Sequence, residues 1–358
     1  MKKIFALFLL IILVISCSSS SDENTTTPIL EEQMYFPPLT GDTWETKSIA
    51  DLEWNQAAVQ PLLDYLELKH SKSFIVLVNG RIVLENYFNG HTASNTWQWN
   101  SAGKTLVAST IGIAQQENLI NINTKVSHYL GSSWTSEPSE KEDLITSRHL
   151  LTMTSGINDD SDLVIIPNLT YLADAGTRWS YHNVFQKLMD VVAASSNQTF
   201  ENYFDVRLKN KIGMDGYWNN GVIYKIYNSN TRSMARFGLL ALNNGKWNSD
   251  QIINQTYFKE SITPSQNINQ SYGYLWWLNG KSSFMIPGSQ TIYPGQLVPS
   301  APVDMYAAMG ASDQRIYVVP SKKMVIVRMG EASNPSNPTF AVSGFDTELW
   351  QKINAVIN

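Results

Sequence analysis

The chain has 358 residues, of which 43% are hydrophobic and 16% are charged, so it can bury a large core in one large domain or two smaller ones. Its net charge of -5 gives a nucleic-acid partner no electrostatic support, and its 11 Trp, 16 Tyr and 13 Phe argue against disorder. The single cysteine excludes a disulfide within the chain.

The first 16 residues have the pattern of a secretory signal peptide. Two lysines precede an unbroken apolar run over residues 4–15, which is too short for a comfortable membrane span. The sequence Val-Ile-Ser-Cys that ends at Cys17 resembles a bacterial lipobox, in which the cysteine is lipidated and becomes the first residue. We therefore expect a signal peptide over 1–16 and an exported lipoprotein, anchored through Cys17 at the periplasmic face of a membrane or at the cell surface. An ordinary signal peptide with an incidental cysteine is the alternative.

Residues 17–35 are polar and low in complexity, which favours a flexible tether before a folded domain over 36–358. Within this domain, residues 55–69 carry apolar side chains at helical spacing. The dipeptide Asn79-Gly80 joins two β-branched runs, and Asn-Gly in that position is the strongest short signal for a β-hairpin. The sheet is therefore expected to begin early in the domain.

The middle of the chain, roughly 101–265, has mostly helical periodicity, and the C-terminal part returns to strands. Helices are expected over 101–118, 146–155, 183–194, 231–242 and 345–357, and strands over 272–278, 305–309, 315–319 and 324–329. This order predicts an α/β (α+β) fold in which one antiparallel sheet is built from both ends of the chain. The sheet lobe would comprise 45–100 and 270–358 and the helical lobe 101–269, with a small-molecule cleft between them.

A Ser-x-x-Lys motif opens the expected 101–118 helix. Ser101 and Lys104 are three residues apart, so their side chains would lie on one helix face. A serine hydroxyl is a weak nucleophile until a base takes its proton, and a buried lysine with a lowered pKa can be that base. A helix start with a surface lysine has the same pattern, so the interpretation depends on what else the chain supplies.

A second motif, Tyr-x-Asn, follows at Tyr181 and Asn183. A tyrosine beside a lysine ammonium ionises more readily and can pass protons. An asparagine amide can both donate to and accept from a substrate amide. An aromatic anchor in front of the 183–194 helix is the alternative interpretation of the same residues.

These motifs together resemble the serine β-lactamase-related family, which includes class C β-lactamases, D-Ala-D-Ala carboxypeptidases, family VIII esterases and amide-oligomer hydrolases. The segments that carry the resemblance, in order and spacing, are 101–104 (SAGK), 148–156 (RHLLTMTSG), 176–183 (GTRWSYHN) and 272–277 (YGYLWW). The resemblance covers about residues 45–357. It implies a β-lactamase/transpeptidase-like fold, with an antiparallel sheet flanked by helices and an active site between the sheet and a helical subdomain.

Carried over by position, the resemblance implies that Ser101 is the acylating nucleophile. Lys104 would be the base, or the charge that keeps the base competent. Tyr181 would relay the proton to the leaving group, and Asn183 would orient the substrate. Members of the family hold the oxyanion with the backbone N–H of the nucleophile and a second N–H from a facing strand.

On that facing strand the sequence departs from the β-lactamases. Ala311 N–H would be the second oxyanion donor, and Gly310 would permit close approach. Gln314 completes a Gly-x-x-x-Gln pattern that resembles esterase-like and amide-hydrolase members. β-Lactamases and transpeptidases carry Lys-Thr-Gly where this chain has Ala-Met-Gly, so the lysine that binds a substrate carboxylate is missing. This favours an esterase or amidase over a true β-lactamase. Asp313, if it projects into the cleft, would repel anionic substrates and favour cationic or neutral ones.

Other chemistries find little support in the sequence. The five histidines lack metal-ligand spacing and no cysteine follows Cys17, so we expect no metal and no other cofactor. No glycine-rich phosphate loop follows a strand. The nearest match to the Gly-x-Ser-x-Gly elbow of a Ser-His-Asp hydrolase, residues 310–314, fails at its last position.

The sequence therefore predicts a serine hydrolase that forms an acyl-enzyme on a small ester, amide or short peptide. A catalytically silent, surface-tethered binding module would need the same fold without an activated Ser101, and it remains the alternative. The expected partners are a small-molecule substrate and, through the lipid, a membrane, but no nucleic acid. The sequence leaves the natural substrate and the oligomeric state open.

Overall fold

The computed structural model describes residues 32–221, 224–337 and 342–358. The expected signal peptide, the lipidation site Cys17 and most of the expected tether lie outside these residues. Residues Met34–Asn358 form one compact unit.

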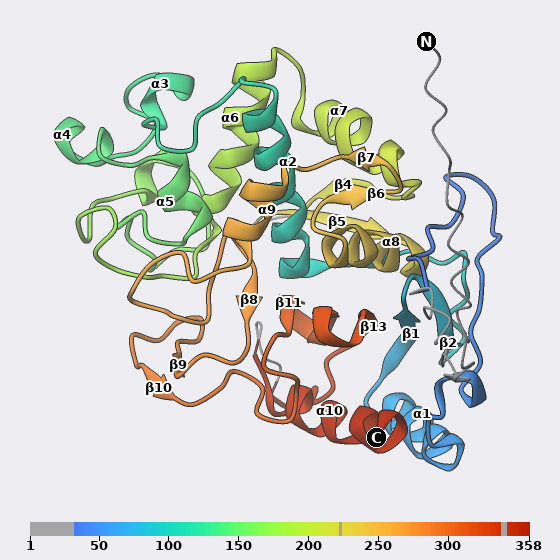
Figure 1. The fold of residues 1–358 in the computed structure, drawn as a ribbon. Helices are drawn as coiled ribbons and strands as arrows, with labels where there is room; N and C mark the ends of the chain where they lie inside the picture. The colour runs from blue at the N-terminus through green and yellow to red at the C-terminus, as the bar shows by residue number, and fades with distance from the viewer. Residues whose placement is uncertain (1–31, 222–223, 338–341) are drawn as a thin grey trace, which may run out of the picture. The chain divides into compact units, whose positions relative to one another are not determined.

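The unit is built on a six-stranded antiparallel sheet with the strand order β2-β1-β13-β12-β11-β8. Its strands are β1 (Ser71–Val78), β2 (Arg81–Tyr87), β8 (Trp277–Leu278), β11 (Tyr306–Gly310), β12 (Gln314–Val319) and β13 (Met324–Gly330). The N-terminal hairpin pairs with the C-terminal strands, as Figure 1 shows by the blue β1 beside the red β13. The prediction of one antiparallel sheet built from both ends of the chain is confirmed.

The Asn79-Gly80 turn joins β1 to β2 as expected. Both residues have left-handed backbones, with φ of 50° and 84°, which is the signature of a type I′ turn. Gly80 also lies against the N-terminal segment, because a Cβ at this position would be only 1.8 Å from the Tyr35 carbonyl oxygen. A glycine is therefore required here for both its conformation and its size.

Helices cover both faces of this sheet. They are α1 (Val59–Leu68), α2 (Lys104–Gln116), α3 (Ser127–Leu130), α4 (Ser139–Glu142), α5 (Ser147–Leu151), α6 (Lys187–Ser196), α7 (Phe200–Phe204), α8 (Thr231–Leu242), α9 (Gln255–Ser261) and α10 (Gly344–Ile357). Helix α8 packs on one face through Gly238, where a Cβ would lie 2.4 Å from Val325. Successive strand residues point to opposite faces, and Trp350 of α10 contacts Tyr317 on the other face. Helix α1 packs beside α10 (Figure 1).

A buried ionic network fastens α10 to the sheet. Arg315 of β12 donates to the Asp346 carboxylate at 2.6 and 3.0 Å, and both side chains are fully buried. Tyr317 also donates to Asp346, at 2.5 Å. Burial alone would lower the pKa of Arg315, but the carboxylates of Asp346 and Asp313 outweigh it and raise that pKa.

The expected elements were wrong in three places. The helix expected over 146–155 ends at Leu151, and Met153 already has a left-handed backbone. Only Trp277–Leu278 of the expected 272–278 strand is extended in the sheet, because the aromatic side chains before it pack as a cluster. The expected helical region also contributes two strands, β4 and β5, to a second sheet with the order β3-β5-β4. The smaller strands are β3 (Trp97–Gln98), β4 (Tyr217–Asn220), β5 (Lys225–Ser229), β6 (Lys246–Trp247), β7 (Asp250–Gln251), β9 (Ser283–Phe284) and β10 (Tyr293–Pro294).

Candidate active site

The Ser-x-x-Lys motif lies where a tight turn enters α2. Ser101 is in the 3-10 turn Asn100–Gly103, and Lys104 is the first residue of the α-helix. The Lys104 amine donates to the Ser101 hydroxyl across 2.7 Å. Asn100 has a left-handed backbone (φ 49°), and its amide donates to the Ala311 carbonyl at 2.8 Å, which ties the turn to the end of β11.

Lys104 is only 2% exposed, and aromatic rings surround its amine. The Nζ atom lies 4.6 Å from the ring centres of Tyr181 and Phe185, and 5.5 Å from that of Tyr224. Burial lowers the pKa of Lys104 to about 7, and the Asp162 carboxylate opposes this shift. A large fraction of this lysine is therefore neutral at neutral pH, as a general base must be.

Tyr181 belongs to an aromatic cluster that meets the nucleophile. Its ring centre is 5.6 Å from that of Trp277 and 6.1 Å from that of Tyr272. Burial raises the pKa of Tyr181, although hydrogen bonds with Ser101 and Trp277 oppose the shift. The sequence analysis expected Tyr181 to ionise more easily beside the lysine. This expectation is wrong, because Lys104 lies over the ring face and the effect of burial on the pKa of Tyr181 is the largest. At neutral pH the phenol keeps its proton.

Gly310, the last residue of β11, lies directly against the nucleophile turn. A Cβ there would be 2.5 Å from the Trp99 carbonyl oxygen and 3.0 Å from the Ser101 amide nitrogen. The φ of Gly310 is an ordinary -131°, so space rather than conformation requires glycine. The strand end that carries Gly310 and Ala311 thus faces Ser101, as the sequence predicted.

Two residues after this strand end point away from Ser101. Gln314 is fully buried, and its side chain bonds the backbone of Gly330 at 2.5 and 3.1 Å and the Ser312 carbonyl at 3.0 Å. Asp313 is 3% exposed and forms an ion pair with Arg315 at 3.0 Å. Gln314 therefore holds sheet strands together rather than a substrate, and the expected influence of Asp313 on substrate charge is wrong. The left-handed backbones of Ser312 and Asp313 turn both side chains inward.

A short segment over residues 159–162, which we call the acidic strap, runs along the Tyr-x-Asn motif. Its contacts are Asp159 with Arg178 (2.9 Å) and with the Ser180 hydroxyl, the Ser161 carbonyl with His182 Nε2 (2.8 Å), and the Asp162 carbonyl and carboxylate with the Asn183 amide (3.3 and 3.4 Å). The amide expected to orient the substrate thus holds the strap in this structure. The strap in turn places the Asp162 carboxylate beside the site.

Sequence reasoning missed Tyr224 and Asp162. Tyr224 immediately precedes β5, about 120 residues after the nucleophile, and a half-buried tyrosine at a strand start has no distinctive pattern. Burial raises the pKa of Tyr224, and a hydrogen bond with Ser101 opposes the shift. The rings of two tyrosines, Tyr181 and Tyr224, therefore lie beside the lysine that contacts the nucleophile. A tertiary contact of this kind leaves no signal in a single sequence.

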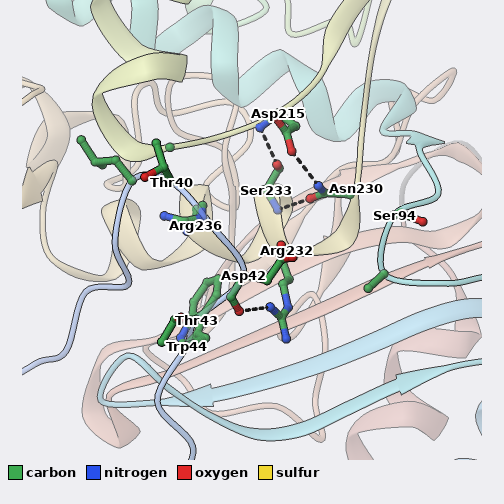
Figure 2. A pocket seen from close by; sticks show the side chains of 14 residues that line it. Thr40, Asp42, Thr43, Trp44, Ser94, Asp215, Asn230, Arg232, Ser233 and Arg236 are labelled. Carbon is green, nitrogen blue, oxygen red and sulfur yellow. Dashed lines mark hydrogen bonds between the residues drawn. The ribbon is translucent and has the colours of Figure 1, made fainter.

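A separate cavity of about 670 Å³ lies between the N-terminal segment and the start of α8 (Figure 2). No residue of the Ser101 site lines it. Its two arginines already have partners, since Arg232 forms two hydrogen bonds with Glu85, at 2.7 and 2.8 Å, and Arg236 donates to the Pro38 carbonyl at 2.7 Å. We assign this cavity to the packing of the N-terminal segment rather than to catalysis.

Neither a metal site nor a membrane span is evident in the described part of the chain. Over residues 32–221, 224–337 and 342–358, no group of three or more His, Cys, Asp or Glu side chains could hold a metal ion. In the same ranges, no helix combines the length and the hydrophobicity that crossing a bilayer demands.

Comparison with known proteins defines the class. Residues 69–339 match the family model described as Beta-lactamase, and the chain belongs to that family. Its fold is the β-lactamase/transpeptidase fold expected from the sequence. An uncharacterised protein of Alkalihalophilus pseudofirmus is 23% identical over 295 residues, covering 72% of this chain and 82% of that protein.

Solved structures with the same fold include hydrolases. A Bacillus anthracis protein assigned as a 6-aminohexanoate-dimer hydrolase superposes with a TM-score of 0.66 at 18% identity, covering 90% of this chain and 89% of its own. A family VIII carboxylesterase superposes with a TM-score of 0.64 at 14% identity, covering 88% and 98%. At these identities the likeness establishes the fold, and the chain is a β-lactamase-fold protein with hydrolases among its structural neighbours.

Proposed function

We propose that the protein is a serine hydrolase that forms an acyl-enzyme at Ser101 on small esters or amides. The observation that carries this proposal is the 2.7 Å contact between Lys104 Nζ and Ser101 Oγ, made by an amine whose pKa is lowered to about 7. A surface lysine at the start of a helix would be solvated and charged. This lysine is enclosed by aromatic rings, so it can accept a proton near neutral pH.

The proton path follows from the lowered pKa of Lys104 and the raised pKa of Tyr181. Neutral Lys104 takes the proton of Ser101 as Oγ attacks the substrate carbonyl carbon and the carbonyl electrons move onto oxygen. Tyr181, which keeps its proton because burial raises its pKa, donates that proton to the leaving alcohol or amine as the bond to carbon breaks. Proton transfer from the Lys104 ammonium then restores Tyr181. In deacylation, water takes the place of the leaving group and the same transfers run in reverse.

The developing oxyanion would be held by the backbone N–H groups of Ser101 and Ala311. The close approach of Gly310 to the Ser101 amide, with no room for a Cβ, supports this arrangement. Preorganised backbone donors of this kind need no reorganisation during the reaction. The Arg315 guanidinium donates to the Gly310 carbonyl at 2.9 Å, so it would hold the peptide group that carries the Ala311 N–H, and the Asn100 side-chain amide holds the next peptide group through the Ala311 carbonyl.

The expected substrate class follows from the absence of a lysine at the end of strand β11, which faces Ser101. Ala308-Met309-Gly310 on β11 offers no cation to a substrate carboxylate, so we expect little activity on β-lactams or D-Ala-D-Ala termini. The likeness to a carboxylesterase and to a protein assigned as an amide-dimer hydrolase supports esters and small amides instead.

We also propose that the protein is exported and anchored by a lipid on Cys17, with the signal peptide 1–16 removed. Mass spectrometry of the membrane fraction would show an N-terminal diacylglyceryl-cysteine peptide. Recovery of a Cys17→Ala variant with the same membrane attachment would contradict this proposal.

Activity on a panel of substrates tests the proposed function. Residues 34–358, which form one compact unit, would be assayed with nitrophenyl esters, nitroanilides and a chromogenic cephalosporin. We expect ester or anilide turnover that is abolished in Ser101→Ala and falls at least 10²-fold (roughly) in Lys104→Met, with slow or no cephalosporin hydrolysis. Absence of turnover on every substrate would instead favour the silent binding module.

A further inference from the structure

Side chains hold the backbone carbonyls of the loop that follows β11. Ser312 and Asp313 in this loop are consecutive left-handed residues, with φ of 57° and 56°. Such backbones are costly for residues other than glycine, and they persist where the surroundings fix them. The donors are Arg315 to the carbonyls of Gly310 (2.9 Å) and Gln314 (3.0 Å), Asn100 to that of Ala311 (2.8 Å), and Arg328 to those of Ser312 (2.8 Å) and Asp313 (3.1 Å).

One peptide group of this loop lies between a buried charge and the proposed oxyanion donor. Arg315 is fully buried, and its Nη1 atom donates to the Gly310 carbonyl oxygen at 2.9 Å. The bond from Gly310 to Ala311 is trans, and a trans peptide group points its C=O and its N–H in opposite directions. The Ala311 N–H is therefore directed away from the guanidinium. It leaves the strand end close to the nucleophile turn, since a Gly310 Cβ would lie 3.0 Å from the Ser101 amide nitrogen.

The guanidinium charge acts through this peptide group. A positively charged donor on a carbonyl oxygen polarises the amide, so the N–H on the other side becomes a stronger donor. Arg315 stays charged in the core because two buried carboxylates compensate it, those of Asp346 at 2.6 Å and Asp313 at 3.0 Å. Helix α10, which carries Asp346, thus supports a charge that bears on the end of β11.

The second buried arginine of the loop has a different task. Arg328 is also fully buried, but its hydrogen bonds go to the Ser71 hydroxyl and to the carbonyls of Ser312, Asp313, Lys69 and Glu331. These bonds shape the left-handed turn and tie it to the neighbouring strands. The carbonyl of the peptide group that would serve the oxyanion is held by Arg315.

We propose that Arg315 is a positioning residue of the oxyanion site, whose guanidinium orients and polarises the Gly310–Ala311 peptide group. The inference rests on the proposed function and gives the buried ion pair with α10 a role in the reaction. Arg315 touches no substrate and acts through the Ala311 N–H. The negative oxygen exists in the transition state and not in the bound ester, so loss of Arg315 should lower kcat and kcat/KM by the same factor.

A trifluoromethyl ketone provides a readout that a purely structural role would not move. Ser101 Oγ adds to the ketone carbon, its proton passes to Lys104, and the ketone oxygen becomes the negative oxygen of a hemiketal. Fluorine NMR of the bound hemiketal over a pH series gives the pKa of that oxygen. A stronger oxyanion site lowers this pKa, because it favours the charged form. Ester kcat and KM, and the melting temperature by circular dichroism, would be measured on the same proteins.

Two variants remove the effect of Arg315 in different ways. Arg315→Lys keeps a cation for the two carboxylates, but one ammonium cannot replace the planar fork that also reaches Gly310. Arg315→Met combined with Asp346→Leu removes the ion pair without leaving the Asp346 charge unpaired, a replacement that buried ion pairs often tolerate. Tyr317→Phe is the matched control, because it removes the 2.5 Å hydrogen bond to Asp346 from the same buried network and leaves Arg315 in place.

We expect each Arg315 variant to lower kcat about tenfold, as for the loss of one hydrogen bond to a charged group, with KM nearly unchanged. The pKa of the bound hemiketal should rise by about one, which is the same tenfold change. Tyr317→Phe should lower the melting temperature but leave kcat and the hemiketal pKa within about twofold and about 0.3, respectively.

The possible failures are distinguishable. Folded, active Arg315 variants with the kcat and hemiketal pKa of the unaltered protein would overturn this inference alone. So would equal changes in Tyr317→Phe, or failure of both Arg315 variants to fold, since either result would assign Arg315 to stability only. Absence of any Ser101-dependent turnover and of any hemiketal in the unaltered protein would overturn the proposed function as well.

Discussion

Replacing Gly310 with alanine tests the proposed oxyanion site. The new Cβ would lie 2.5 Å from the Trp99 carbonyl oxygen and 3.0 Å from the Ser101 amide nitrogen, whereas ordinary contacts begin at 3.4 Å. Relief of the tighter contact requires β11 or the nucleophile turn to move by about 0.9 Å, the difference between the two distances. Oxyanion donors work at about 2.7–3.1 Å, so a shift of this size removes one of them.

We expect Gly310→Ala to lower kcat by about 10²–10³-fold, which is the cost of one oxyanion donor, and to lower the free energy of unfolding by about 1–3 kcal/mol through overpacking. Ester turnover would be measured well below the melting temperature, with circular dichroism to confirm folding. Gly344→Ala is the matched control, because no atom lies within 4 Å of its Cβ position. A folded Gly310→Ala protein with kcat within about threefold of the unaltered enzyme would refute the assignment.

Three further predictions concern the base, the second phenol and the buried ion pair. Burial lowers the pKa of Lys104 to about 7, and the neutral amine is the proposed base. We therefore expect kcat/KM to rise as the pH increases through about 7 and then to level off. A kcat/KM profile that is flat from about pH 5 to about pH 9 would contradict this. Tyr224→Phe should lower kcat/KM about fivefold, which corresponds to the loss of one hydrogen bond. Tyr181→Phe should lower kcat/KM by at least about 10²-fold, because it removes the proposed proton donor. If Tyr224→Phe had the larger effect, Tyr224 rather than Tyr181 would be the proton donor. Asp346→Ala should cost about 3–5 kcal/mol of unfolding free energy in urea, because it removes one of the two carboxylates that compensate the fully buried Arg315 charge. A loss below about 1 kcal/mol, typical of surface pairs, would show that the network is not stabilising.

The parts of the fold that depend on local sequence were predictable. Asn79-Gly80 supplies two residues that tolerate left-handed backbones, so the turn and the pairing of its strands follow from the chain itself. Ser101 and Lys104 are one helical turn apart, and their contact needs no tertiary information. That one antiparallel sheet joins both ends of the chain followed from the position of the expected strands.

The parts that depend on tertiary packing were not predictable. Gln314 and Asp313 follow the facing strand closely enough to be expected in the cleft, but two left-handed residues turn them into the sheet and toward α10. Tyr224 and Asp162 reach the site only because β5 and the acidic strap fold against it. No residue pattern near either position indicates such contacts.

Covalent trapping at position 101 tests the central claim most directly. A fluorophosphonate would be incubated with residues 34–358, and the adduct would be located by mass spectrometry of the digested protein. The account predicts one adduct, on the peptide that contains Ser101, forming faster as pH rises through about 7 and absent in Ser101→Ala. An adduct on another serine, or labelling that persists in Ser101→Ala, would contradict it.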